Sequence, residues 1–283
     1  MVENRPWLTL VSHLVLILGV AIVAFPVWVT FVGSTHDQAR MLQSPVPLLP
    51  STHLWENYKT VLLQGYGARF GGQPLIYSLM NSMIMALGVC VGKIAISLIA
   101  AFAVVYFKFP FRMAFFWMIF ITLMLPVEVR IVPTYKVVAD LGMLDTYQGL
   151  IIPLIASATA TFLFRQFFLT VPDELAEAAR VDGAGPMRFF KDILLPMSRT
   201  TIAALFVIQF IYGWNQYLWP LLITTKESFY TVVMTVSRQA NVVDAVPQWN
   251  LLTAMAMLAM LPPVLVVIFM QRQFVRGLVE TEK

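Results

Sequence analysis

Six long apolar runs limit how this chain can fold more than any other feature of its sequence. They cover residues of about 8–32, 76–107, 113–127, 149–168, 201–223 and 251–270. A helix needs about 20 apolar residues to cross the hydrocarbon core of a bilayer, and continuous rather than alternating runs favour helices over strands. We therefore predict an all-α, polytopic membrane protein in which residues 1–283 form a single transmembrane domain of six helices.

The composition excludes several other classes of protein. Hydrophobic residues make up 59% of the chain, against about 45–50% in a soluble domain. The single cysteine, Cys90, lies inside an apolar run, so no intrachain disulfide is expected. The three histidines lie far apart without a cysteine or carboxylate at ligand spacing. We predict neither a metal site nor a nucleic-acid partner.

Lysine and arginine residues predict the orientation. If the N-terminus is cytoplasmic, the inner segments carry eleven of these residues and the outer loops seven. Cytoplasmic loops carry an excess of Lys and Arg, and the short inner loop at 108–112 has one at each end. The first apolar run is longer than the roughly 7–15 residues of a signal-peptide core, and no Ala-x-Ala site follows it. We expect a retained first helix and two cytoplasmic termini.

A charged insert, ELAEAARVDGAGPMRFFKDILLP at 174–196, interrupts the apolar sequence on the predicted cytoplasmic side. Pro172, Asp173 and Glu174 favour the start of a helix. Asp182 and Gly183 are expected to end it, with Gly183 in the left-handed conformation.

A second short helix is predicted to follow from Gly185 and Pro186 and to close at Pro196. Each helix has a narrow apolar face, formed in the first by Leu175, Ala178 and Ala179, and in the second by Phe189, Phe190, Ile193, Leu194 and Met197. Neither helix is long enough to be stable alone, so the pair must pack on its own bundle, on a partner, or on both.

The spacing within this insert resembles the EAA loop of permease subunits in binding-protein-dependent ABC importers. The family pattern E-A-A-x3-G-x9-I-x-L-P is met by Glu177, Ala178, Ala179, Gly183, Ile193, Leu195 and Pro196. Asn81-Ser82 and the segments 162–168, 213–222 and 271–278 are also similar to the family, in its maltose-type, carbohydrate-uptake branch.

The resemblance implies a function and a set of partners. The chain would be one of two dissimilar permeases in the bacterial inner membrane, above two copies of a cytoplasmic ATPase, and a periplasmic binding protein would deliver the solute. It would not be an enzyme and would bind no cofactor, because ATP and Mg would be held by the ATPase subunits. Loop 171–197 would couple to the ATPase through Glu177, Ala178, Ala179, Asp182, Gly183, Ile193 and Pro196.

The resemblance also suggests a solute. Residues 3–9 (ENRPWLT) and 115–131 look most like permeases of sn-glycerol-3-phosphate importers. This implies uptake of sn-glycerol-3-phosphate or a related glycerophosphodiester, with a sugar or oligosaccharide as the alternative. The outer loop at 224–250 could dock the binding protein, as in maltose-type relatives, or be plainly solvated.

Residues 88–94 (GVCVGKI) echo a nucleotide-binding P-loop but do not match it. A P-loop needs four residues between its glycines and a Ser or Thr after the lysine, whereas here three residues intervene and Ile94 follows. Gly88 and Gly92 are better explained as a surface for close helix packing.

Lys93 lies near the middle of the second apolar run. A lipid-facing cation at that depth costs roughly 2.5–3.5 kcal/mol, so Lys93 should face the bundle or a water-filled cavity. It would be either a countercharge for an anionic solute in the substrate path or a structural lysine paired with a carbonyl or acid of a neighbouring helix.

Four further residues are candidates for the substrate path. Glu128 and Arg130 follow the third run, and a guanidinium is well suited to replace water around a phosphate ester. Arg130 could equally pair with Glu128 or Asp140, or contact the binding protein. Asn215 and Gln216 could line a polyol path or bridge helices.

Two rival functions belong to other classes. An ion-coupled secondary transporter would use Lys93 as a charge relay, but we find no similarity between the two halves of the chain such as many secondary transporters show. A membrane enzyme is disfavoured because the runs contain no recognisable nucleophile–base or paired-acid arrangement.

Overall fold

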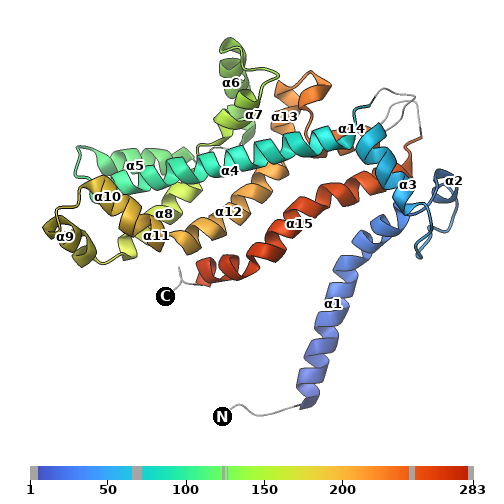
Figure 1. Cartoon of the computed structure of the whole chain (residues 1–283), viewed down its shortest axis with the longest axis horizontal. Coiled ribbons are helices and arrows are strands. Elements are labelled where there is room, and N and C mark those ends of the chain that lie inside the picture. Colours follow the sequence, from blue (N-terminus) through green and yellow to red (C-terminus); the bar gives the residue numbers. More distant parts are fainter. Residues whose placement is uncertain (1–5, 66–71, 123–124, 126, 242–245, 280–283) are drawn as a thin grey trace. The chain divides into compact units, whose positions relative to one another are not determined.

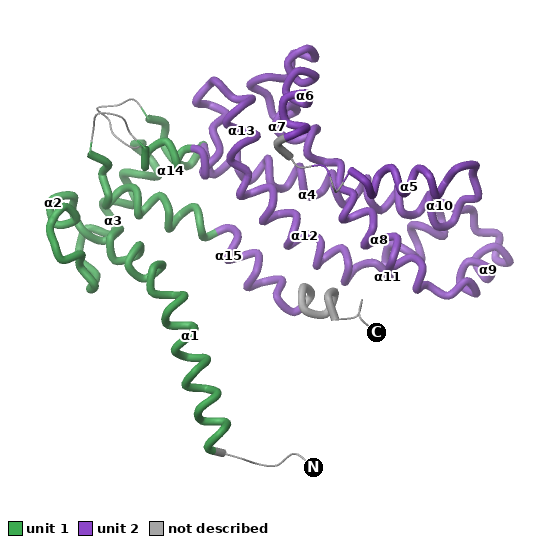
Figure 2. The backbone as a smooth tube through the Cα atoms, turned by 180° about the vertical axis from the view of Figure 1, so that it is seen from behind, with its two compact units in different colours: residues 1–77, 235–261 green, residues 78–234, 262–283 purple. Residues whose placement is uncertain are grey.

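A computed structural model describes residues 6–65, 72–122, 125, 127–241 and 246–279; the side chains of residues 6, 127, 128 and 273–279 are not described. Every regular element in these ranges is a helix (Figure 1). The all-α prediction is therefore confirmed for the part of the chain that the structure describes. The chain divides into two compact units (Figure 2), one comprising residues 1–77 and 235–261 and the other 78–234 and 262–283.

The second unit contains most of the helices. Its members are α4 (Leu75–Tyr106), α5 (Arg112–Ile121), α6 (Val127–Asp140), α7 (Tyr147–Ile151), the 3₁₀ turn η3 (Ile152–Leu154), α8 (Ala158–Thr170), α12 (Arg199–Trp214), α13 (Leu218–Ile223), η5 (Glu227–Phe229) and the start of α14 (Val232–Ala240). A short hairpin, described below, lies between α8 and α12. The core at one end comprises Met85, Val89, Val138, Leu150, Trp219 and Ile223.

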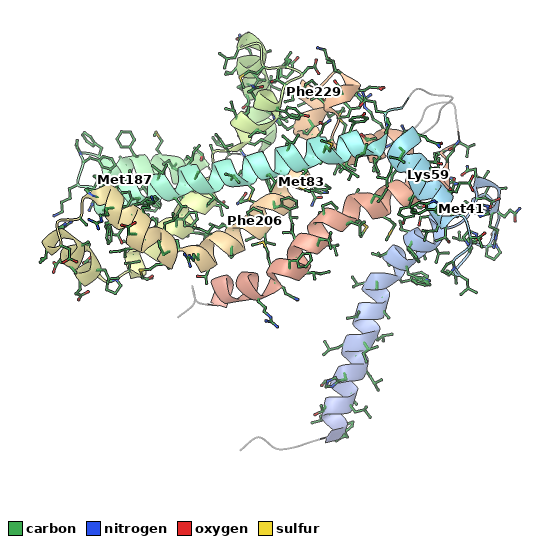
Figure 3. The ribbon with its side chains drawn as sticks, in the orientation of Figure 1. Met41, Lys59, Met83, Met187, Phe206 and Phe229 are labelled. Carbon is green, nitrogen blue, oxygen red and sulfur yellow. The ribbon has the colours of Figure 1, made fainter. Side chains whose placement is uncertain are left out.

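The pair Asn81 and Ser82 ties α4 to the segment around η5. The Asn81 amide donates to the backbone oxygens of Ser228 and Tyr230 at 2.8 and 3.1 Å, and its oxygen accepts from the Tyr147 hydroxyl at 2.7 Å. The Ser82 hydroxyl accepts from the Val232 amide at 2.8 Å. The start of the outer loop, considered above as a docking or a plainly solvated loop, is thus held to α4 by hydrogen bonds at residues 228–232. Phe229, labelled in Figure 3, packs on Tyr147.

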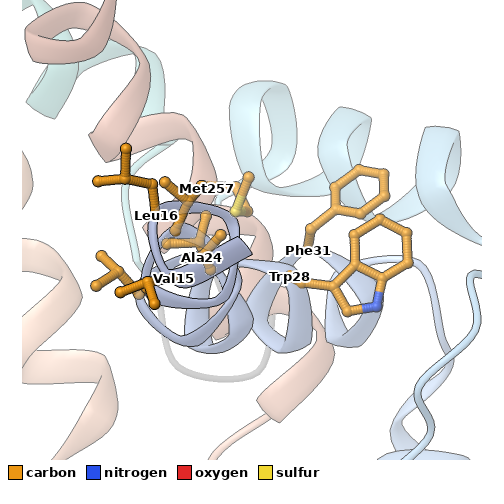
Figure 4. Close-up of a pocket in the computed structure, with 10 residues that line it drawn as sticks. Val15, Leu16, Ala24, Trp28, Phe31 and Met257 are labelled. Carbon is orange, nitrogen blue, oxygen red and sulfur yellow. The ribbon is translucent and has the colours of Figure 1, made fainter. Parts of the chain in front are cut away.

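The first unit is built on α1 (Pro6–Gly33), which is apolar along its whole length. With it are α2 (Gln38–Met41), α3 (Leu54–Lys59), the π-helical turn η1 (Thr60–Gln64), and the first part of α15 (Trp249–Val279). A groove of about 850 Å³ runs along α1, lined by nine of its residues from Val15 to Phe31 and by Met257 (Figure 4). A helix that is hydrophobic on all sides requires an apolar surrounding, which agrees with the predicted first span.

A buried amide joins three elements of this unit beyond the end of α1. The Asn57 side chain donates to the backbone oxygens of Ser34 and His36 at 2.9 and 2.7 Å, and accepts from the Asn250 side chain at 3.0 Å. Asn57 is 5% exposed, so these bonds supply the partners that a buried amide requires.

The predicted spans correspond only in part to single helices. Within the described residues, three helices are long and apolar enough to cross a membrane: Trp7–Gly33, Leu75–Tyr106 and Trp249–Arg272. The predicted span at 149–168 is bent by 48° between Tyr147–Leu154 and Ala158–Thr170. The described spans number between three and five, according to whether each bent pair counts as one.

Two predicted boundaries are wrong. The run at 201–223 is not one helix, because α12 ends at Trp214 and α13 begins at Leu218. Asn215 follows α12 as its cap, and Pro220 in the first turn of α13 suits a helix that starts anew. Within the described part of the run at 113–127, the ten-residue α5 ends at Ile121.

Glycines on α4 and α12 allow close packing, as predicted for Gly88 and Gly92. A Cβ atom on Gly88 would lie 2.6 Å from Ile151 Cδ1, and one on Gly92 would lie 2.5 Å from Ile155 Cγ2. Gly213 of α12 differs from these two because it meets backbone: a Cβ there would lie 2.9 Å from Ala86 Cα. Because a backbone atom cannot move aside as a side chain can, Gly213 fixes the distance between α12 and α4.

Asp145 connects the turn before α7 to the segment after α13. Its carboxylate accepts hydrogen bonds from the Thr225 amide and hydroxyl, both at 2.6 Å, and from the Lys226 amide at 2.9 Å. Slight burial acts to raise the Asp145 pKa, but these hydrogen bonds and the Lys226 charge lower it below the ordinary value.

Substituting Gly213 by valine should destabilise the protein by about 1–3 kcal/mol, because the added side chain overpacks the contact with Ala86. The matched control is Gly19→Val, which places the same side chain on α1 with no atom within 4 Å. The measurement is the apparent Tm in detergent. Equal Tm changes in the two variants would contradict the role given to Gly213.

Asp145→Asn should lower the apparent Tm at pH 7 by about 2–4 °C, because it removes the charge from three hydrogen bonds. A depressed pKa in the folded state means that the stabilisation is complete above the ordinary aspartate pKa of about 3.9 and is lost as pH falls through the lower folded value. The Tm difference should therefore shrink below about pH 4. Asp140→Asn, on an exposed side chain, is the control. A difference that does not change with pH would refute this assignment.

Candidate functional site

The charged insert folds as a helical hairpin, whose first helix is α9 (Asp173–Val181). Gly183 follows with φ +72°, the left-handed conformation predicted for it. The Ala184 amide donates to the Ala179 oxygen at 2.8 Å, and the Gly183 amide to the Arg180 oxygen at 3.0 Å. These two bonds form a Schellman motif, which satisfies carbonyls at the end of a helix.

The second arm comprises α10 (Pro186–Phe189), the π-helical turn η4 (Phe190–Leu194) and α11 (Leu195–Met197). The prediction that Pro196 closes this arm is wrong, because α11 continues to Met197 and the chain bends by 71° into α12 at Ser198. In the π-helical turn, the Leu195 amide donates to the Phe190 oxygen, five residues earlier in the chain. The next residue, Pro196, has no amide hydrogen to donate.

The hairpin presents a mixed charged and apolar surface. Glu177, Ala178 and Asp182 are exposed, and Val181 and Met187 of the same hairpin are 87% and 70% exposed. The sequence analysis missed these two apolar side chains, although both lie within four residues of Gly183. Such uncovered apolar side chains on a charged hairpin suit a protein-binding surface.

Other hairpin residues face inward. Ala179 is 6% exposed and Ile193 is partly buried, whereas Pro196 is exposed. The apolar faces differ from prediction at Ala178 and Met197, which are exposed. Of the seven predicted coupling residues, Ala179 and Ile193 therefore form an inner group, and the other five form an exposed outer group.

An aromatic cluster joins the second arm to α4 and α8. Tyr106 of α4 lies 5.2 Å from the Phe189 ring and 6.1 Å from the Phe168 ring, in edge-to-face geometry. Phe102 of α4 lies 4.9 Å from Phe190. Such pairs add about 0.5–1.5 kcal/mol each beyond the area they bury. The hairpin is thus linked to α12 through the chain and to α4 through packed rings.

A cavity of about 670 Å³ lies among α4, α6, α8 and α12, and its polar lining includes two cations. Lys93 and Arg130 supply the charges, and Gln209, Tyr212 and Gln216 line it from α12 and its end. Hydroxyl groups complete the lining, from Thr122, Thr134, Ser157, Thr159 and Thr161. Two cations with amides and hydroxyls in one cavity are suited to a small anionic polyol.

Lys93 faces this cavity, as its position in an apolar run predicted. It is 6% exposed, and its Nζ lies 3.6 Å from the centroid of the Tyr212 ring. Within the described residues Lys93 forms no ion pair with an acid. The structural alternative, a lysine paired with a carbonyl or an acid of a neighbouring helix, therefore has no acid partner in that part of the chain.

The other four residues predicted for the substrate path differ in whether they line the cavity. Arg130 is exposed and lines the cavity, and Gln216 lines it while its amide donates to the Tyr212 oxygen at 3.1 Å. Asn215 is exposed and absent from the lining. Glu128 belongs to α6, but its side chain lies outside the described residues.

Sequence reasoning missed Gln209 and Tyr212. The available signal is their spacing with Gln216, because residues three to four and seven apart share one face of a helix. Gln209 is 6% exposed, a high degree of burial for an amide in an apolar helix.

Curated proteins and a solved structure are similar to this chain along nearly its whole length. A Brucella melitensis protein named sn-glycerol-3-phosphate transport system permease protein UgpE is 59% identical over 283 residues, which cover all of both chains. An Agrobacterium fabrum protein of the same name is 58% identical with the same coverage. A bacterial ABC transporter structure, described as involved in import of the acidic polysaccharide alginate, has a TM-score of 0.82 at 20% identity over 97% of this chain and 99% of that chain.

The alginate transporter shows a shared fold, and the two curated relatives show a closer kinship along the whole chain. The family described as "Binding-protein-dependent transport system inner membrane component" matches residues 93–280, which include the hairpin and all the residues that line the cavity. The chain therefore belongs to this family of inner-membrane permeases.

Proposed function

We propose that this chain is a membrane-spanning permease subunit of an ATP-driven importer of sn-glycerol-3-phosphate or a related glycerophosphodiester. The observation that carries the proposal is the 59% identity, over the full length of both chains, to a permease named for that solute. The cavity supports it independently, because Lys93 and Arg130 supply positive charge beside amides and hydroxyls.

The proposed assembly has four kinds of component. A second permease completes the path, a periplasmic binding protein delivers the solute, and two copies of an ATPase bind ATP and Mg on the cytoplasmic side. Six spans with both termini in the cytoplasm would place loop 108–112 and the hairpin on the side of the ATPase, in keeping with the distribution of Lys and Arg.

The hairpin would transmit the ATPase cycle. Glu177, Asp182, Val181 and Met187 offer the exposed contacts, with Ala178 leaving room for close approach. Movement of the hairpin would reach α12 through Ser198 and α4 through Phe189 and Phe190, which are packed on Phe102 and Tyr106. Both helices line the cavity, so hairpin movement would alter its shape.

The cavity would replace part of the water lost by the phosphate group. A guanidinium and an ammonium both bind phosphate oxygens by charge-assisted hydrogen bonds, and amides and hydroxyls suit a glycerol moiety. A neutral sugar would need no such pair of cations. A sugar importer is therefore the second candidate, behind an importer of a phosphate ester. An ion-coupled secondary transporter is disfavoured by membership of a binding-protein-dependent family.

Gly183→Asp should abolish uptake and uncouple or release the ATPase, while the chain stays in the membrane. Gly183 has φ +72° with nothing within 4 Å, so an added side chain strains the turn and intrudes on the docking surface. The matched control is Gly142→Asp, with φ +67° and nothing within 4 Å, outside the hairpin. Solute uptake and ATPase co-purification are the measurements. Normal uptake by Gly183→Asp would refute the coupling role.

Lys93→Gln and Arg130→Gln should each lower the rate of glycerol-3-phosphate transport by about tenfold or more, since a hydrogen bond to a charged group is worth roughly 1.5–3 kcal/mol. The control is Lys136→Gln, an exposed cation on α6 that does not line the cavity. Transport is measured in the reconstituted complex with glycerol-3-phosphate and, in parallel, maltose. If only maltose is transported, the phosphate assignment is wrong.

A further inference from the structure

Lys93 and Tyr212, which both line the cavity, form a cation–ring contact. The Lys93 Nζ lies 3.6 Å from the ring centroid, well within the roughly 6 Å over which a ring attracts a cation. The two residues come from α4 and α12, and both line the cavity.

An aromatic ring and a carboxylate differ as partners of an ammonium group. A carboxylate would neutralise the charge and compete with an anionic solute for it. The ring face attracts the ammonium without carrying a net charge, and it leaves the other sides of the group open. Because Lys93 has a flexible four-carbon stem, the ring also limits where the charge can lie.

We propose that Tyr212 is a positioning residue that holds the Lys93 ammonium toward the cavity and thereby sets the rate at which an anionic solute passes. This inference rests on the proposed function, because it assigns Tyr212 to the same solute path. The ring carries the role, because the Lys93 ammonium lies over its face.

The position of Tyr212 is itself fixed from two sides. Its backbone oxygen accepts a hydrogen bond from the side-chain amide of Gln216 at 3.1 Å. The next residue, Gly213, packs on Ala86 of α4. Tyr212 therefore lies next to a close contact between the two helices, and its ring has a defined place relative to Lys93.

The expected effect is on maximal rate rather than on KM. The binding protein captures the solute before the permease does, so its affinity governs KM, whereas groups along the path govern how fast the released solute moves. Tyr212→Leu should lower the maximal transport rate about three- to tenfold, as expected for loss of a partly desolvated cation–ring contact. Tyr212→Phe should transport at the wild-type rate.

The test uses the complete complex in proteoliposomes, with saturating binding protein outside, ATP inside and radiolabelled sn-glycerol-3-phosphate. Rates and KM are measured for the wild type, Tyr212→Leu, Tyr212→Phe, Lys93→Gln and the double variant Lys93→Gln/Tyr212→Leu. Tyr217→Leu is the matched control, since Tyr217 is similarly exposed but does not line the cavity. Gel filtration of each complex confirms that it is assembled.

The proposal expects the double variant to be no slower than Lys93→Gln alone, because Tyr212 acts only through Lys93. It is overturned if Tyr212→Leu transports at the wild-type rate, if Tyr212→Phe is as slow as Tyr212→Leu, or if the two single effects add. Wild-type transport by Lys93→Gln would instead refute the solute path itself.

Discussion

The contact between Gly213 and Ala86 is the interaction on which the functional part of the molecule depends. It brings the backbones of α12 and α4 together at a distance that no larger residue allows. One residue before it, Tyr212 reaches Lys93, and the cavity opens along the same two helices. Without this approach the cation would lose its ring and the cavity one of its walls.

The breaks in the apolar helices follow from the same arrangement. Backbone that leaves the helical ladder at membrane depth must be buried in protein or line a wet cavity. Residues 156 and 157, between η3 and α8, line the cavity, as does Gln216 between α12 and α13. Ser157 supplies replacements for lost bonds, because its hydroxyl caps the Ala160 amide and its carbonyl accepts from Thr161 and Ser97.

Sequence patterns predicted most of what depends on local chemistry. The apolar runs gave the helical class, and the left-handed turn at Gly183 followed from the needs of a helix end. Lys93 was expected to face the bundle or a water-filled cavity because a lipid-facing cation at that depth is costly. The breaks at residues 155–157 and 215–217 were missed because hydropathy measures apolarity, which a bent helix and a straight one share.

The cavity could be anticipated only in part. Gln209 and Tyr212 look ordinary in an apolar run, and their role depends on α4 lying opposite them. Arg130 comes from a helix far along the chain, so its presence in the same cavity as Lys93 is a property of packing. Asn215 and Gln216 are neighbours in sequence, but only Gln216 lines the cavity, because the chain leaves the helix between them.

Because the chain bends by 71° at Ser198, a rotation at this point displaces the far end of α12 more than its start. Arg199 and Tyr212 are separated by about 20 Å along the helix axis, at 1.5 Å per residue. A rotation of only about 5° around the bend would carry the Tyr212 ring by about 2 Å, since the displacement grows with this length. Added to a contact of 3.6 Å, that displacement brings the ring close to the roughly 6 Å limit of the cation–ring attraction. Small angular changes at the hairpin would thus weaken the contact that holds the cation.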